Sequence, residues 1–464
     1  MTQNLSTPLS SQWVADAAAS FLADPAARLA GNAVATTDVE TVSLDRAVLT
    51  SIDSSVSDLI PDAAITDQKR SGRCWAFAGL NTLRAAMIKD LGLEGFSLSQ
   101  NFIYFHDKLE KANAFLNRFT ADMVAGRDLE DREVVADLAS PAGDGGWWPE
   151  FAHLVAKYGM VPAYVMPDTQ SATDSQAMND HLDTLLRRAA LRIRAVVEPA
   201  GDGPARDTAA RDTAAQDAAA QDAAVRELRE AAMADVYRLL AIHLGTPPSR
   251  FVWQYRNKDK AFTRVGTMTP REFARRYAPD VDEFVVVVHD PRPQIRQDTL
   301  YAIDRSETMV GQGPQTHVAA SLEVVKAAAV AAVRDGEPVW FACDVAKQRD
   351  KKAGVWDAAL HDYEGLYGVG LSMTKAERLV ARESAPTHAM CLTGVDLVDG
   401  TPRRWRVENS WGEETAEKGF WTMNDSWFDQ YVYQVVVRAD RLPQATRSAL
   451  EAEPVLLPSW DPMF

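Results

Sequence analysis

One cysteine of this 464-residue chain stands where its thiolate would be favoured. Cys74 follows Gly72 and begins a stretch, 74–91, whose apolar spacing predicts a helix that ends at Gly92. A helix N-terminus carries partial positive charge and free N–H groups, which favour a thiolate over a thiol. A thiolate is the nucleophile that covalent hydrolysis of an amide requires. The cysteine alone does not establish a catalytic nucleophile, because a small buried structural residue that begins a helix would show the same pattern.

Two later residues complete a catalytic set with Cys74. His388 begins an expected strand, 388–397, and Asn409 follows it 21 residues later, where a second expected strand, 404–408, ends in a turn. If these two strands pair as a hairpin, both side chains lie near the same end of the sheet. Cys–His–Asn is a convergent relative of the serine triad, in which histidine moves the proton and asparagine orients the imidazole. The set therefore points to acyl transfer through a thiol.

Gln68 and Trp411 supply two supporting roles around the same chemistry. Gln68 precedes Cys74 by six residues and could donate its amide to an oxyanion beside the Cys74 backbone N–H. Trp411 follows Asn409 closely and could shield the histidine–asparagine bond from water.

Composition bounds what else the protein could be. With 46% hydrophobic and 25% charged residues, the chain is typical of globular proteins, and it has no apolar run of the roughly 20 residues that a bilayer span needs. Its net charge of −16 disfavours binding to nucleic acid. Three cysteines cannot form a disulfide scaffold, and Cys343 and Cys391 lie in apolar segments that predict packed thiols. The odd count and the lack of a secretory pattern at the N-terminus lead us to expect a cytoplasmic location.

The expected elements give an α+β fold class, with helices first and an antiparallel sheet last. A second helix is expected after the capping-box pattern of residues 97–100. Asp399-Gly400 is a hairpin signal between the strands that carry the histidine and the asparagine. Short apolar runs predict strands at 284–288, 339–343, 388–397, 404–408, 419–423 and 431–437.

A degenerate five-residue repeat occupies residues 201–224. Its period matches no helical period, so apolar positions drift around any helix that forms. We expect either an exposed, alanine-driven helical extension or a partly disordered insertion, leading into an amphipathic helix at 226–244.

Taken together, these residues resemble the papain-like cysteine peptidases, and specifically their bleomycin hydrolase / aminopeptidase C branch. The stretch Ser71-Gly72-Arg73-Cys74-Trp75 departs from general papain usage but is similar to the branch form. The cysteine and histidine are 314 residues apart, far more than the roughly 130–150 typical of papain-type enzymes, and the resemblance places a helical insertion in the excess. Further matching stretches are 98–100, 107–110, 144–147, 336–347, 405–412 and 427–433.

The resemblance implies a papain-like fold and a role for each site residue. Cys74 would be the nucleophile, His388 the general base and then acid, Asn409 its orienting partner, and Gln68 part of the oxyanion hole. Trp411 would cover the Asn–His bond, and Gly145-Gly146 would run antiparallel to the substrate backbone, which can approach only where no Cβ intrudes. No cofactor or metal is implied. His289 has no second ligand at useful spacing, so a structural role is expected for it.

Five segments follow from the resemblance. They are an N-terminal extension at 1–60, a helical subdomain at 61–165, a helical insertion at 166–283, a β subdomain at 284–452 and a C-terminal arm at 453–464 that runs toward the cleft. A homohexamer enclosing its active sites is also implied.

The C-terminus bears on specificity. In the branch, the terminal carboxylate lies where it can pair with the substrate α-ammonium, which makes the enzyme an aminopeptidase. Here the chain ends at Phe464, about three residues short of the branch pattern, or roughly 10 Å of extended chain. We therefore expect a cysteine aminopeptidase acting on peptides, with two alternatives: an oligopeptidase or endopeptidase whose cleft is left open, and an inactive scaffold, which would not need all four catalytic residues.

Overall fold

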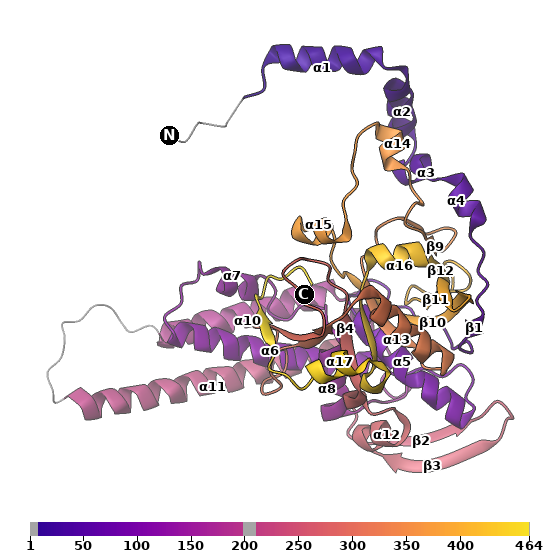
Figure 1. Cartoon of the computed structure of the whole chain (residues 1–464). Helices are drawn as coiled ribbons and strands as arrows, with labels where there is room; N and C mark the ends of the chain where they lie inside the picture. The colour runs from indigo at the N-terminus through magenta and orange to yellow at the C-terminus, as the bar shows by residue number, and fades with distance from the viewer. Residues whose placement is uncertain (1–7, 198–209, 464) are drawn as a thin grey trace.

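The computed structural model describes residues 8–197 and 210–463. Helices gather on one side of the molecule and a large sheet on the other, with a thin arm projecting from the body (Figure 1). The helices are α1 (Ser11–Ala23), α2 (Pro25–Thr36), α3 (Val39–Ser43), α4 (Arg46–Ser51), α5 (Cys74–Leu91), α6 (Gln100–Val124), α7 (Arg132–Ala139), α8 (Trp148–Tyr158), α9 (Gln170–Thr173), α10 (Gln176–Val197), α11 (Ala210–Leu244), α12 (Pro270–Tyr277), α13 (Leu322–Arg334), α14 (Tyr363–Tyr367), α15 (Lys375–Val380), α16 (Asp425–Tyr431) and α17 (Gln444–Ala449). The strands are β1 (Asp58–Leu59), β2 (Phe251–Arg256), β3 (Phe262–Met268), β4 (Phe284–Val288), β5 (Thr299–Ile303), β6 (Thr316–Ala319), β7 (Val339–Cys343), β8 (Arg349–Asp350), β9 (Val355–Trp356), β10 (His388–Val398), β11 (Thr401–Glu408), β12 (Phe420–Asn424), β13 (Val432–Arg438) and β14 (Val455–Leu457).

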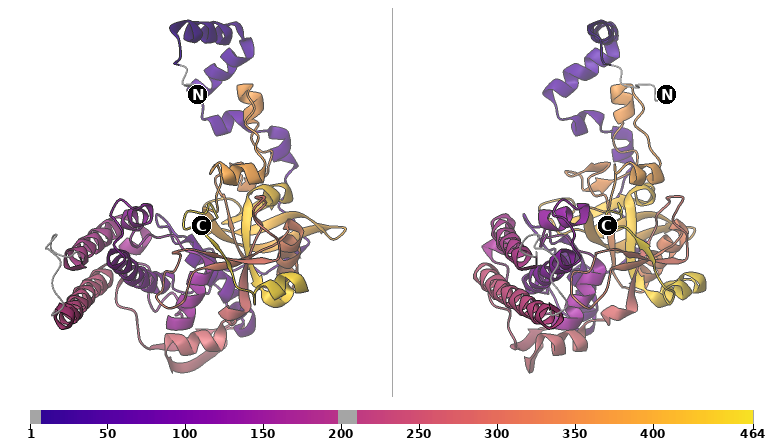
Figure 2. Two further views of the ribbon diagram at one scale, coloured as in Figure 1. Left: turned by 60° about the vertical axis from the view of Figure 1, so that its left-hand side comes forward. Right: turned by 90° about the vertical axis from the view of Figure 1, so that its left-hand side faces the viewer.

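The projecting arm consists of α1 to α4, and two side views show the first two helices standing clear of the body (Figure 2). Neither α1 nor α2 buries a residue. Large apolar side chains are exposed along them, namely Trp13, Phe21, Leu22 and Leu29. A helix pair that hides none of its apolar surface gains little from packing within its own chain.

Helix α5 forms over the predicted residues, 74–91, and ends as expected at Gly92, whose φ of 61° is the left-handed conformation that glycine adopts without strain. Most of the helix is buried, because α5 lies between α6 and α8 on one side and β7 and β10 on the other. Its first residue, Cys74, is thereby held against the sheet.

The next helix, α6, starts by a simpler cap than the sequence suggested. The Ser99 side chain accepts from the Phe102 backbone N–H at 3.0 Å and so caps the helix. The capping-box pattern of residues 97–100 predicts Ser97 as the capping residue instead. Ser99 takes the position because its hydroxyl also donates to the Met166 carbonyl at 2.5 Å, a contact between distant segments.

The insertion after residue 166 is mainly the antiparallel pair α10 and α11, which lie side by side and extend from the body (Figures 1 and 2). The repeat is helical from residue 210 onward, which confirms the helical expectation for that part, and its residues 201–209 lie outside the described residues. The sequence missed the hairpin β2–β3, which follows α11 and interrupts the expected all-helical insertion.

The sheet runs in the order β14-β5-β6-β4-β13-β7-β10-β11-β12-β9-β8, with β1 beside β10. All six expected strands form, and β10 and β11 pair antiparallel as the predicted hairpin around Asp399-Gly400, both with positive φ. The sheet is mixed rather than purely antiparallel, because β4–β6, β14–β5 and β12–β9 pair in parallel. Strands β5, β6 and β14 lacked a strong apolar run and were not expected.

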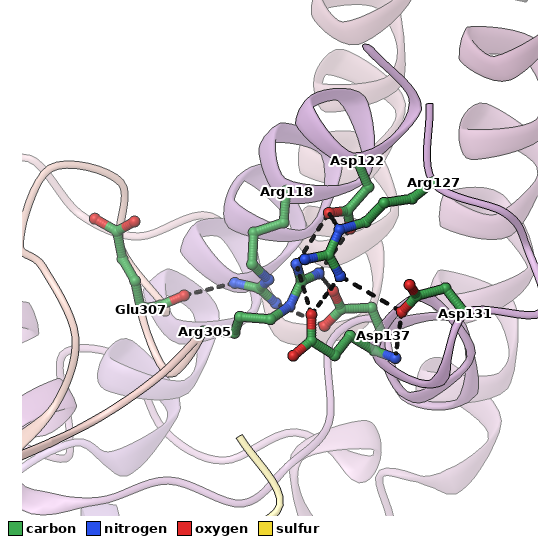
Figure 3. Close-up of polar contacts among 8 residues, drawn as sticks. Arg118, Asp122, Arg127, Asp131, Asp137, Arg305 and Glu307 are labelled. Atoms are coloured by element: carbon green, nitrogen blue, oxygen red, sulfur yellow. Dashed lines mark hydrogen bonds and ion pairs between the residues drawn. The ribbon is translucent and has the colours of Figure 1, made fainter. Parts of the chain in front are cut away.

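Buried side chains form two clusters, one between the sheet and the helical side and one on the opposite face beneath α13 and α16. A charged cluster ties the helical side to the chain after β5 (Figure 3). In it, Arg305 donates to Asp122 of α6 at 2.9 and 2.7 Å and to Asp137 of α7 at 2.5 Å. Across the described ranges, no helix combines the length and apolarity that a bilayer crossing requires.

Candidate active site

The β10–β11 hairpin brings His388 and Asn409 together at one end of the sheet. Nε2 of His388 lies 3.0 Å from Oδ1 of Asn409, and both side chains are buried. The Ser410 backbone N–H also donates to that Oδ1, at 2.8 Å, which identifies the atom as the oxygen of the amide. Nε2 therefore carries the proton, and Nδ1 is left as the basic nitrogen of the ring.

Trp411 lies over the histidine, as expected. The two ring centroids are 5.0 Å apart, and the Trp411 indole is held from its other side by Trp421 at 5.4 Å. Burial is the main reason why the pKa of His388 falls to about 4. The hydrogen bond that His388 donates to Asn409 works in the opposite direction, and the positive charge of Arg349 adds a small further lowering.

Cys74 begins α5, with its thiol half-buried and unoxidised. Burial raises the pKa of this thiol, although the backbone N–H groups of Ala389, Trp75 and Cys74 itself pull the pKa downward. The sequence-based expectation that the helix terminus would favour the thiolate is therefore wrong for the resting site, because desolvation outweighs the helix end. Burial thus favours the neutral thiol of Cys74 and the neutral imidazole of His388.

Gln68 links the cysteine loop to the asparagine turn. Its Nε2 donates to the Ser71 carbonyl at 2.7 Å, and its Oε1 accepts from the Ser410 hydroxyl at 2.7 Å. Its backbone N–H donates to the Ser410 carbonyl at 2.9 Å. The Ser71 bond uses one of the two amide protons, so one remains for a substrate oxyanion.

The two glycines differ in whether their surroundings leave room for a side chain. A Cβ on Gly145 would meet nothing within 4 Å, so this position is open to an approaching chain. A Cβ on Gly146 would lie 2.6 Å from the Trp75 indole and 2.8 Å from the Glu150 carboxylate, so packing alone requires glycine there. The Gly145 carbonyl accepts from Nζ of Lys111 at 2.5 Å, which fixes the orientation of this backbone.

Sequence reasoning missed Asp144, which joins the glycine pair to the cysteine loop. Its carboxylate is 2.7 Å from Nζ of Lys108 and accepts from the Gly72 backbone N–H at 3.1 Å. The hydroxyls of Tyr104 and Ser175 each donate to it at 2.6 Å, and Asn179 donates at 2.7 Å. Burial favours the neutral acid, but Lys108 and these donors outweigh it and hold the pKa of Asp144 well below its usual range. In the sequence, only its position directly before the Gly145-Gly146 pair could have indicated that Asp144 belongs to the site.

The C-terminal arm is anchored close to the glycines. Nη2 of Arg292 lies 2.9 Å from both carboxylate oxygens of Asp461, and Oδ1 of Asp461 accepts from the Met463 backbone N–H at 3.0 Å. Met463 is buried and lines a small pocket with Trp147, the residue after the glycine pair. Phe464 lies outside the described residues.

The remaining candidates do not belong to the set of Cys74, His388, Asn409 and Gln68, although Cys343 packs directly beside it, with its Sγ 3.7 Å from the His388 backbone carbonyl. Cys343 and Cys391 are buried free thiols, as predicted. Nδ1 of His289 lies 3.0 Å from Nζ of Lys375, a structural contact. Within residues 8–197 and 210–463, no three His, Cys, Asp or Glu side chains gather as a set that could hold a metal ion.

Comparison with known proteins agrees with this geometry. The Peptidase C1-like family matches residues 8–464. Bleomycin hydrolase of Homo sapiens is 37% identical, over 99% of this chain and 98% of its own, and aminopeptidase C of Lactobacillus delbrueckii subsp. lactis is 34% identical over the same shares of the two chains. The crystal structure of PepW from Lactobacillus rhamnosis HN001 superposes with a TM-score of 0.91 at 34% identity, covering 99% of each chain. The chain therefore belongs to the Peptidase C1-like family and is a cysteine peptidase.

Proposed function

We propose that this protein is a cysteine aminopeptidase that removes N-terminal residues from peptides through an acyl-enzyme on Cys74. The observation that carries the proposal is the buried His388–Asn409 pair, 3.0 Å apart beneath Trp411, at the sheet end against which α5 holds Cys74. The names of the relatives, bleomycin hydrolase and aminopeptidase C, support the same activity. None of them favours the oligopeptidase alternative.

The chemistry needs only side chains of this chain. Nδ1 of His388 takes the proton of the Cys74 thiol as the sulfur attacks the scissile carbonyl. The Cys74 backbone N–H and the remaining amide proton of Gln68 stabilise the oxyanion. His388 then gives its proton to the departing amine, and the same steps with water release the acyl group and restore the thiol.

The pKa directions define the resting state of this pair. Because burial lowers the pKa of His388 and raises that of Cys74, imidazole and thiol are both neutral before substrate arrives. Proton transfer between them then accompanies attack. Asn409 supports it by holding the ring and stabilising the imidazolium that forms.

Restriction to N-terminal residues is assigned to the C-terminal arm. Asp461 is fixed by Arg292, and Met463 packs beside Trp147, so the described part of the arm reaches the neighbourhood of the Gly145-Gly146 backbone that we propose binds the substrate. A terminal carboxylate there would pair with a substrate α-ammonium and block longer chains.

The test is product analysis by mass spectrometry of one unstructured ten-residue peptide, with its N-terminus free or acetylated. The native protein and Cys74→Ala are run in parallel with reductant. We expect stepwise loss of single residues from the free peptide only. Internal cuts that tolerate acetylation would replace the proposal with an open-cleft peptidase, and cleavage that survives Cys74→Ala would refute it.

Self-assembly is part of the proposal, as a homohexamer with inward-facing active sites. The support is the arm, whose helices α1 and α2 leave Trp13, Phe21, Leu22 and Leu29 exposed. Native mass spectrometry should show six chains, and the double variant Leu22→Glu/Leu29→Glu should dissociate them. Val398→Glu, an equally exposed apolar position on the β10–β11 hairpin, is the control that should leave assembly intact.

We further propose a cytoplasmic location and the segment boundaries given above. The three unoxidised thiols fit a reducing compartment, in which cysteines stay free. The break between the proposed segments at 283 and 284 falls where α12 and a short 3-10 turn give way to β4, a central strand of the large sheet.

A further inference from the structure

Trp411 marks the side of the site from which the leaving group departs. His388 must deliver its proton to the departing amine, and Trp411 covers that histidine. We place the acyl part of the substrate at Gly145-Gly146, on the other flank of Cys74. Trp75, the residue after Cys74 in α5, packs against Gly146 and donates to the Asp144 carbonyl. A side chain next to Trp411 therefore stands beside the peptide segment that leaves.

Arg349, the first residue of β8, occupies this position. Its Cζ lies 5.7 Å from the centroid of the Trp411 ring, and its charge acts on His388. The backbone carbonyl of Arg349 accepts from Nε2 of His361 at 2.9 Å, which fixes the strand but leaves the side chain uncommitted.

The guanidinium has no carboxylate partner within ion-pair distance in the described parts of the chain. Its one hydrogen bond goes from Nη1 to the Val345 carbonyl at a long 3.4 Å, while its buried Nε has no acceptor. The acidic groups that act on Arg349 do so from farther away, from Glu40 and Asp344. Asp344 is already bound by the Ser384 hydroxyl at 2.8 Å.

Neighbouring charges on this flank, in contrast, are paired. Lys347, two residues before Arg349, lies 2.6 Å from Glu383, and Asp67, whose backbone bridges to Trp411, lies 2.5 Å from Lys69. A half-buried guanidinium that lacks an acceptor is costly unless something else supplies one.

We propose that Arg349 and Trp411 form a subsite for a carboxylate on the departing side of the substrate. A planar guanidinium binds a carboxylate through two parallel hydrogen bonds, and the aromatic face beside it supports the peptide. At about 3.3 Å per extended residue, the carboxylate would belong to the first or second residue after the scissile bond. It is either the C-terminus of a short peptide or an Asp or Glu side chain. The inference deepens the proposed peptidase function and rests on it.

The experiment compares kcat/KM within two matched substrate pairs. Ala-Ala is compared with Ala-Ala-amide, and Ala-Glu-Ala-amide with Ala-Gln-Ala-amide, by quantifying the loss of each substrate. We expect the carboxylate member of at least one pair to be favoured about tenfold, as for a charge-assisted bond. A preference in the first pair alone identifies the C-terminal carboxylate, and one in the second alone identifies the side chain.

Arg349→Met should reduce the preference to about one, and Arg349→Lys should keep part of it, because lysine retains the charge without the fork. Ratios are taken within each enzyme, so a general change in activity cancels. Lys347→Met is the matched control, since its ammonium is already paired, and it should keep the native ratio.

Two results would overturn the inference: no preference for the carboxylate members in the native protein, or an unchanged preference in Arg349→Met. Hydrolysis of alanyl-aminomethylcoumarin, which has no departing peptide, reports separately on the proposed function. If the native protein fails on this substrate, the peptidase proposal falls and the subsite inference falls with it.

Discussion

His388 and Cys74 lie where water is largely excluded, and burial shifts their pKa values in opposite directions. A buried imidazole resists protonation, so its pKa falls to about 4, and a buried thiol resists ionisation. The basic form of His388 therefore persists in mildly acidic solution, and activity should be retained until the pH approaches about 4. The cover that Trp411 gives to the histidine controls this limit.

Replacing Trp411 by alanine should move the acid limb of the kcat/KM profile toward neutral pH by at least about one unit. Water that enters the space stabilises the imidazolium, so the pKa of His388 rises toward the usual value near 6.5. The profile is measured on a fluorogenic aminoacyl substrate from pH 4 to 8. Tyr164→Ala removes an exposed aromatic elsewhere and should leave the limb in place. An unshifted limb in Trp411→Ala would show that burial by this ring does not set the pKa.

Asp144→Asn should destabilise the protein by about 3–5 kcal/mol, because it leaves the buried ammonium of Lys108 without its counter-charge. It should also lower kcat/KM, since the carboxylate that holds the Gly72 backbone positions the loop before Cys74. Urea unfolding and steady-state kinetics measure the two effects. Asp183→Asn, which breaks a partly exposed helical pair with Arg187, should cost less than about 1 kcal/mol. Equal losses in the two variants would contradict this account.

Among the elements, α6 and α7 are joined to the segment after β5 by the Arg305 cluster (Figure 3). Arg305 reaches Asp122 on one helix and Asp137 on the other, and all three side chains are mostly buried. The same cluster includes Arg127, which is more exposed and contacts acids of the same helical side. Burial, not the number of contacts, should decide which of the two arginines contributes more to the free energy of unfolding.

Arg305→Met should lower the free energy of unfolding by about 3 kcal/mol, because it leaves the mostly buried Asp122 and Asp137 with only longer contacts, to Arg127 at 3.5 Å and Arg118 at 3.4 Å. Arg127→Met, in the same cluster, should cost below about 1 kcal/mol, because its guanidinium is more than a third exposed. Both are measured by chemical denaturation at neutral pH. A larger loss in Arg127→Met than in Arg305→Met would reverse the assignment.

At the scale of the whole molecule, four histidines share a strongly lowered pKa. Burial is the main cause that lowers the pKa to about 4 for His106, His289, His317 and His388. In the unfolded chain each would titrate near 6.5. Between these values the unfolded state binds more protons than the folded state, so acid favours unfolding.

The free energy of unfolding should therefore fall steadily as the pH drops from about 6.5 toward 4. Denaturation midpoints at pH 7, 6 and 5 measure the slope. His106→Phe keeps an aromatic ring against Tyr158 but cannot titrate, so its slope should be shallower by the contribution of one histidine. A slope that is unchanged in this variant would remove His106 from the group.

Features that depend on neighbours along the chain could be predicted from the amino-acid sequence. Apolar spacing and Gly92 fixed the bounds of α5, and Asp399-Gly400 fixed the β10–β11 hairpin that carries His388 and leads to Asn409. These features follow from local conformational preferences, which act over a few residues. The candidate catalytic residues could be predicted for the same reason, because each stands at the end of such an element.

The arrangement of charge and solvent around these residues could not be predicted in this way, because it depends on packing between distant parts of the chain. The partners of Asp144 come from three separate segments, namely the cysteine loop, α6 and the start of α10, and no local pattern links them. The neutral resting state of Cys74 and His388 depends on desolvation by distant chain, which overrides the helix terminus that the sequence displayed. Arg349 meets Trp411 from 62 residues away, and its lack of a carboxylate partner is a property of three-dimensional packing.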